Sequence, residues 1–81
     1  MTFDIALPSP LNIIIAGKEL LVRTVREAAW LLAERWPDPA CRWFLAALKA
    51  CASALERRSD PARASLAFIQ AALSAGFLVK A

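Results

Sequence analysis

The side chains of this 81-residue chain that could do chemistry are two cysteines, Cys41 and Cys51, and seven carboxylates, with no histidine. Histidine is the side chain that most often transfers protons near neutral pH, so neither thiol has the usual base to activate it. The carboxylates fall at predicted strand ends, helix caps and solvent faces, and no pair of them shares a site. We therefore expect no catalytic residues and no enzyme activity.

The same residues argue against a bound metal or cofactor. Two cysteines without histidine make a poor zinc site, and the chain has no phosphate-binding loop. Cys41 and Cys51 fall on one predicted helix, about 15 Å apart along its axis, which is beyond the reach of a disulfide. We expect no metal and no cofactor, and we interpret both cysteines as small core residues.

The basic residues could bind nucleic acid, because the net charge is +3 and the pI is about 9.4. Arg42 and Lys49 lie two turns apart on one helix face, with Arg35 near them as the third member of a candidate basic patch. The other cations are scattered, and no tyrosine is present for base stacking. A solvated helix face is the commoner explanation, so weak nucleic-acid binding is the alternative function.

Apolar residues are in excess. They make up 59% of the chain and the mean hydropathy is +0.49, whereas a typical soluble domain is about 45–50% apolar. A chain of this length buries only about 60% of its unfolded surface. The excess favours self-association or docking on another protein, although alanine supplies much of it, so a loosely filled monomer is the alternative.

No segment is expected to span a membrane. Residues 64–79 carry no charge, but a spanning helix needs about 20 apolar residues, and this stretch contains Ser65, Gln70, Ser74 and Gly76. The N-terminus has Asp4 and no basic flank before an apolar run, which is unlike a secretory signal. We expect a cytoplasmic protein.

The first part of the chain predicts a β-hairpin. Residues 1–10 end in Pro8-Ser9-Pro10 and form an extended lead-in. Within the predicted hairpin, residues 11–24, the segments 11–15 and 19–23 flank Ala16-Gly17-Lys18, which suits a type II′ turn with Gly17 in the first central position. In that register Ile15 pairs with Leu20 and Ile13 with Val22. Leu11, Ile13, Ile15, Leu20 and Val22 then share the core face, while Asn12, Ile14, Leu21 and Arg23 share the other.

Three helices follow, so the expected fold is α+β: a hairpin and three helices in one domain, residues 1–81. Thr24 and Glu27 form a capping box that starts a helix over 25–36. Asp38-Pro39 starts a second helix over 39–58, and Asp60-Pro61 a third over 61–76. The second helix ends with two cations, Arg57 and Arg58. Gly76 ends the third helix as a cap residue with a left-handed backbone conformation.

The periodicity of each helix assigns its buried face. In 25–36 the apolar stripe is Val25, Ala28, Ala29, Leu32 and Trp36, with Trp30 and Leu31 near the polar side. In 39–58 the inward residues are Ala40, Phe44, Ala47, Leu48, Cys51 and Leu55, with Trp43 flanking them and interpreted as core. The third helix has a small-residue stripe of Ala64, Ala67, Phe68, Ala71 and Ala75, with Leu66, Ile69 and Leu73 opposite. It therefore lies either at the centre of the fold or at a subunit interface.

Several apolar side chains remain without a partner in this scheme. The candidate interface residues are Ile14, Leu21, Trp30, Leu66, Ile69 and Leu73. Ile14 and Leu21 need either the apolar tail 77–79 or another subunit as cover. Trp30 is a typical interface anchor, but it could equally pack under the hairpin or stack on Arg26 one turn earlier.

The order of these segments resembles a family of small uncharacterised proteins of rhizobia and related bacteria, catalogued as domain of unknown function 982. The resemblance covers residues 10–77. It is carried by Pro10-Leu11-Asn12-Ile13, Arg26-Glu27-Ala28, Leu32, Arg35-Trp36-Pro37, Ala47, Cys51, Leu55, Ala67-Phe68-Ile69-Gln70-Ala71-Ala72 and Ala75-Gly76. The family usually has an arginine where this chain has Ser65. The resemblance implies a hairpin-plus-helices fold and an intracellular bacterial protein, and it supplies no activity and no site residues.

Together these features predict a small, non-catalytic module that binds another protein or itself, most simply as a homodimer with twofold symmetry.

Overall fold

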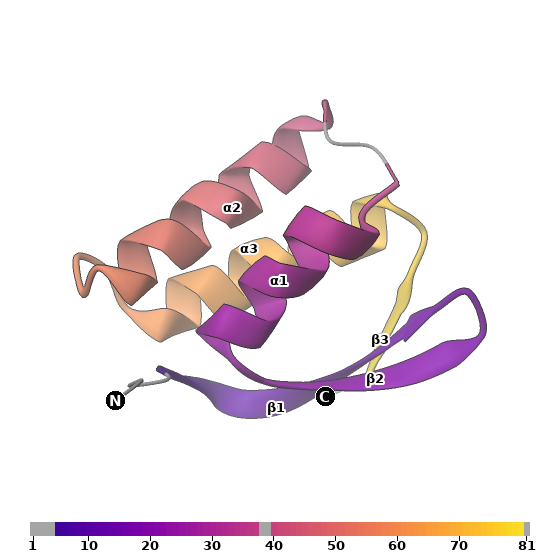
Figure 1. Cartoon of the computed structure of the whole chain (residues 1–81), viewed down its shortest axis with the longest axis horizontal. Helices are drawn as coiled ribbons and strands as arrows, with labels where there is room; N and C mark the ends of the chain where they lie inside the picture. The colour runs from indigo at the N-terminus through magenta and orange to yellow at the C-terminus, as the bar shows by residue number, and fades with distance from the viewer. Residues whose placement is uncertain (1–4, 38–39, 81) are drawn as a thin grey trace.

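Three antiparallel strands form a sheet in the order β2-β1-β3, and helices cover one face of it (Figure 1). The computed structural model describes residues 5–37 and 40–80. Its strands are β1 (Ala6–Ile15), β2 (Lys18–Thr24) and β3 (Leu78–Lys80), and its helices are α1 (Val25–Arg35), α2 (Arg42–Leu55) and α3 (Pro61–Ser74). Helix α1 packs on β2 and α3 on β1, while α2 packs on both helices on the side away from the sheet (Figure 1). The predicted α+β class is confirmed.

The third strand is a correction to the predicted hairpin and three helices. Leu78–Lys80 pairs antiparallel with β1, with Ile13 opposite Val79 and Ile14 opposite Leu78. The tail therefore extends the sheet at the edge of β1 and does not cover the outer face of the hairpin. Leu78 joins Ile14 on that outer face, and Leu78 is itself exposed. The lead-in is also partly strand, because β1 begins at Ala6.

The predicted hairpin register is wrong by two residues. Ile15 pairs with Lys18, Ile13 with Leu20, and Leu11 with Val22. The two turn residues are Ala16 and Gly17, with φ of 52° and 80°, and positive φ at both central positions is typical of a type I′ turn and not of the expected II′ turn. A shift of two residues keeps every side chain on its face. Leu11, Ile13, Ile15 and Val22 are accordingly buried as predicted.

The local signals for helix starts predict two of the three helices. The Glu27 N–H donates to Thr24 Oγ1 at 3.1 Å and the Thr24 N–H donates to Glu27 Oε1 at 3.2 Å, so the capping box is confirmed. Asp60 accepts from the Ala62 N–H at 2.9 Å, as expected for the N-cap of α3. The predicted Asp38-Pro39 start lies outside the described residues. Helix α2 instead begins at Arg42, later than predicted, with Cys41 as its N-cap residue.

Two helices end in the same hydrogen-bonded cap. After α3, the Gly76 N–H donates to the Leu73 carbonyl and the Phe77 N–H to the Ala72 carbonyl, with Gly76 at a φ of 85° as predicted. After α2 the same pair of bonds forms from Arg57 and Arg58, with Arg57 at a φ of 62°. This is a Schellman motif in both places. It ends α2 at Leu55, so Arg57 and Arg58 follow the helix and do not belong to its last turn.

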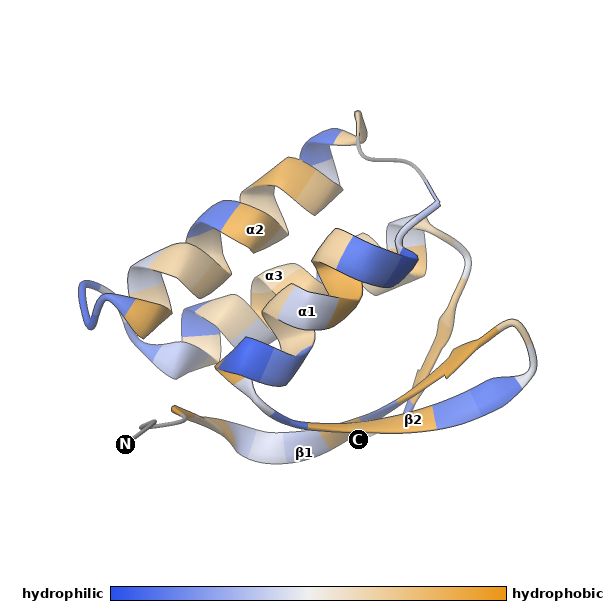
Figure 2. Cartoon of the chain, viewed as in Figure 1, coloured by the Kyte–Doolittle hydropathy of each residue, from blue (hydrophilic) through white to orange (hydrophobic). Residues whose placement is uncertain are grey.

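The core lies between the sheet and the helices, and hydrophilic residues gather in the loop from α2 to α3 and at the ends of α1 (Figure 2). Three helix assignments are corrected. Leu31 is buried and not near the polar side, because α1 is enclosed by both the sheet and α2. Ala40 and Leu55 are exposed, since the inward stripe of α2 runs through Phe44, Ala47, Cys51 and Ala54. None of the described helices is long and apolar enough to cross a bilayer.

Candidate functional site

A groove runs between α1 and the edge strand β2. Its volume is about 450 Å³. The lining side chains are Leu20 and Leu21 from β2 and Arg26, Glu27, Trp30, Leu31 and Arg35 from α1. Leucine and tryptophan make an apolar floor, and the charged side chains come from the two ends of the helix segment. The groove therefore combines an apolar centre with a charged border.

Trp30 dominates this groove. It is 53% exposed, although its neighbour Leu31 is buried in the core. The capping box fixes where α1 begins, and hence the direction of each side chain around the helix. Leu31 then points into the core, while Trp30, 100° away around the helix, lines the groove together with residues of β2. Leu21, 43% exposed, lies on the strand side of the same groove.

The predicted interface residues do not gather on one surface. Leu21 and Trp30 both line the groove. Ile14 is half-buried on the outer face of the sheet, opposite Leu78. Leu66 and Leu73 are 65% and 58% exposed on α3, with Ile69 half-buried beside them. Sequence reasoning singled out Leu21 and Trp30 separately but did not bring them together, and it missed Leu20 and Leu31 as groove residues.

The predicted basic patch is divided between two elements. Arg35 lines the groove on α1, whereas Arg42 and Lys49 are exposed on α2. The guanidinium of Arg42 lies 5.1 Å from the centre of the Trp43 ring, which is a cation–π contact. Trp43 is exposed, so its assignment to the core is wrong. The Arg42 side chain is thereby held against its own helix.

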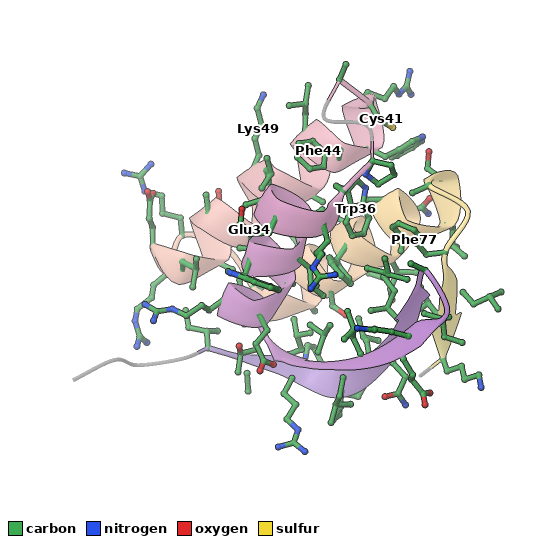
Figure 3. The ribbon with its side chains drawn as sticks, turned by 45° about the vertical axis from the view of Figure 1, so that its right-hand side comes forward. Glu34, Trp36, Cys41, Phe44, Lys49 and Phe77 are labelled. Carbon is green, nitrogen blue, oxygen red and sulfur yellow. The ribbon has the colours of Figure 1, made fainter. Side chains whose placement is uncertain are left out.

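Trp36 has a different role from Trp30, because it packs at the junction of the helices and the C-terminal strand. Its ring centre lies 5.0 Å from that of Phe77 in an edge-on arrangement and 5.5 Å from that of Phe68. Figure 3 shows Trp36 beside Phe77 at this junction. Trp36 is half-buried, in agreement with its place on the predicted stripe. It is a structural residue outside the groove.

The two thiols occupy contrasting places. Cys51 is fully buried, and burial raises the pKa of its thiol from 9.0 to about 11, so the thiolate that acts as a nucleophile is disfavoured. Cys41 lies beside a second hollow of about 300 Å³ near Trp36 and Ala71, with its Sγ 3.6 Å from Ser74 Oγ. Neither cysteine forms a disulfide. Within residues 5–37 and 40–80 no three side chains of the metal-binding kinds come together.

The chain matches the model of one protein family. A model described as Protein of unknown function (DUF982) matches residues 9–79, which include every residue that lines the groove. This match confirms the resemblance seen in the sequence. No curated protein and no solved structure matches the chain.

Proposed function

We propose that this chain, which belongs to the family described as Protein of unknown function (DUF982), is a non-catalytic module that binds protein chains through the groove between α1 and β2. The observation that carries the proposal is the exposed Trp30 beside the open edge of a sheet. The homodimer is its simplest assembled form.

The composition of the groove supports a protein partner. Protein interfaces concentrate tryptophan and arginine at their centres and are bordered by polar groups. Here Trp30 and the two leucines of β2 are flanked by Arg26, Glu27 and Arg35. An exposed tryptophan held over apolar neighbours loses unfavourable contact with water when a partner covers it.

The sheet edge supports the same proposal independently. β2 has β1 as a neighbour, and no described strand lies on its other side. An edge strand presents unpaired backbone groups that an added strand can bind. A partner that enters the groove therefore meets both an apolar anchor and a row of backbone hydrogen-bonding groups.

The state of the cysteines supports a non-catalytic role in the cytoplasm. Burial raises the pKa of the Cys51 thiol to about 11, so the nucleophilic thiolate is scarcer than in an ordinary cysteine. Neither cysteine forms a disulfide, as is usual for thiols in a reducing compartment.

Weak nucleic-acid binding is a second candidate, and the net charge of +3 favours it. Phosphate contacts would make such binding fall steeply as the salt concentration rises. In a filter-binding titration, absence of retained nucleic acid at low salt excludes this candidate. Because Arg35 and Lys49 lie on different helices, we expect that result.

The experiment for the main proposal compares two variants of matched chemistry. Trp30→Ser removes the groove anchor, and Leu73→Ser removes an equally exposed apolar side chain on α3. Each variant and the natural chain are measured by light scattering of the pure protein and by affinity capture from the native cell, after circular dichroism has shown that all three fold.

We expect Trp30→Ser to weaken association, with itself or with a captured protein, while Leu73→Ser leaves it unchanged. If the natural chain is monomeric and captures the same proteins as Trp30→Ser, the groove is not a docking site and the proposal is wrong. Loss of association in Leu73→Ser alone would also contradict it, because α3 would then be the contact surface.

A further inference from the structure

The hydrogen-bond alternation of the hairpin shows which backbone groups of β2 face the open edge. Ile15 and Lys18 close a two-residue turn, so they form a hydrogen-bonded pair, and every second pair after them does the same. Leu20 and Val22 therefore direct their N–H and C=O groups toward β1. Glu19, Leu21 and Arg23 direct theirs outward.

One of these outward groups is already bonded within the chain. The Arg23 N–H donates to Glu27 Oε1 at 2.7 Å, which agrees with the outward direction derived from the register. The Glu27 side chain thus occupies the outward N–H group at the C-terminal end of β2 and also caps α1. The Glu19 and Leu21 amides lie further from this cap, at the part of the edge that borders the groove.

The charges of β2 are complementary to themselves when the strand is reversed. Lys18-Glu19-Leu20-Leu21-Val22-Arg23-Thr24 has Leu21 at its centre, with an acidic residue two positions before it and a basic residue two positions after it. In an antiparallel pair centred on Leu21, Glu19 of each strand faces Arg23 of the other. Opposite charges in facing positions stabilise an antiparallel pair, and like charges destabilise it.

We propose that the occupant of the groove is a second copy of this chain, whose β2 pairs antiparallel with the first β2 about a twofold axis at Leu21. The two three-stranded sheets then join into one continuous sheet. This inference rests on the proposed function, because it names the partner that the same groove binds.

Each part of the edge has a role in this dimer. The two Leu21 residues exchange N–H···O=C hydrogen bonds at the axis, and the Glu19 N–H faces the Arg23 carbonyl of the second copy. Because the Arg23 N–H keeps Glu27 as its acceptor, the backbone ladder is short. The Glu19–Arg23 pairs on the outer face therefore determine the register.

The groove face is complementary as well. Lys18 of the second copy comes opposite Thr24, whose N–H donates to the Glu27 carboxylate. A lysine there approaches the negative charge of Glu27, while Leu20 of the second copy enters under Trp30. An arbitrary extended peptide does not in general carry a lysine, a glutamate and an arginine at these spacings. The second copy therefore fits the edge better than such a peptide does.

A charge exchange tests the register. Glu19 and Arg23 are both exposed, so Glu19→Arg, Arg23→Glu and the double variant Glu19→Arg/Arg23→Glu should all fold. We expect each single variant to weaken the dimer about tenfold in sedimentation equilibrium, because two symmetric pairs become like-charged, and the double variant to return to within about threefold of the natural chain. Lys49→Glu on α2 is the matched control and should have no effect.

A proline substitution tests the backbone contact. Because the Leu21 N–H points away from β1, Leu21→Pro is tolerated by the hairpin but cannot bond across the axis. We expect it to be monomeric with unchanged helical circular dichroism, whereas Leu21→Ala keeps its N–H and retains partial association. If Leu21→Pro does not fold, the charge exchange decides by itself.

Three results would overturn the inference. The first is a natural chain that stays monomeric at about 100 µM; the proposed function then still holds if Trp30→Ser loses a different captured protein. The second is a dimer in which the double charge variant is no tighter than the single ones. The third is a dimer that Ile69→Glu abolishes and the β2 variants do not, which would assign the contact to α3.

Discussion

Trp36→Ala should destabilise the fold much more than Trp30→Ala, although Trp36 directly follows the helix that carries Trp30. The Trp36 ring contacts Phe68, which is fully buried, and Phe77, at 5.5 and 5.0 Å between ring centres. Such pairs contribute about 0.5–1.5 kcal/mol each beyond the area they bury. Trp30 makes no ring contact of this kind among the described aromatic residues and is 53% exposed.

The magnitudes follow from these environments. A buried tryptophan replaced by alanine costs about 3–5 kcal/mol, and because Trp36 is half-buried we expect the lower end, about 3 kcal/mol. Surface substitutions usually change stability by about 0.5 kcal/mol, and the apolar neighbours of Trp30 raise this to about 1 kcal/mol. The difference of about 2 kcal/mol corresponds to about 2 M urea when the denaturant slope is about 1 kcal/mol/M.

The assay is urea unfolding followed by circular dichroism, at a chain concentration low enough for the monomer to predominate. Circular dichroism is preferable to fluorescence because both substitutions remove a tryptophan. A Trp36→Ala chain that is already unfolded without urea, beside a folded Trp30→Ala chain, also meets the prediction. Equal losses, or a larger loss at Trp30, would refute the reasoning that separates a structural tryptophan from a docking one.

Other predictions concern the helix ends and a buried thiol. Thr24→Ala should lower stability by about 1 kcal/mol, because it removes the acceptor for the Glu27 N–H; an unchanged unfolding midpoint would contradict this role. Arg57→Gly should raise stability by about 1 kcal/mol, because Arg57 has a φ of 62° at the end of α2, and Arg57→Ala, which keeps its Cβ, should give no gain. The free energy of unfolding should fall as pH rises from 9 toward 11, because burial raises the pKa of Cys51 to about 11 and the unfolded chain releases that proton first. Cys51→Ala should lose this part of the slope, and an identical slope in both chains would be inconsistent with it.

Features coded by neighbouring residues were predictable from the sequence. The capping box at Thr24, the Asp60 cap and the Gly76 cap depend on side chains within a few positions, and all three are present. The core face of the hairpin was also predictable. Successive side chains of a strand point to opposite faces of the sheet, so an error of two residues in the pairing register leaves each side chain on its predicted face. The turn itself was not, because Ala16 adopts a positive φ, which alanine rarely does.

Features that depend on distant contacts were not predictable. β3 has only three residues, too few for a pattern, and it forms because the edge of β1 is available beside it. Leu31 was misassigned because the periodicity of a helix was used to assign a single buried face. Helix α1 in fact packs against both β2 and α2, so a wider part of its surface is buried. The groove requires the packing of α1 against β2, which no periodicity reports, so Leu21 and Trp30 could be selected but not placed together.

The most direct test of the docking surface is the hydrogen exchange rate of the Leu21 amide, measured by NMR in concentrated and in dilute samples. The Val22 amide faces β1 and serves as the internal reference, with slow exchange at both concentrations. We predict that the Leu21 amide exchanges slowly in the concentrated sample, where the β2 edges pair, and rapidly on dilution. Rapid exchange of Leu21 at both concentrations, and with any captured partner bound, would contradict a contact at the β2 edge.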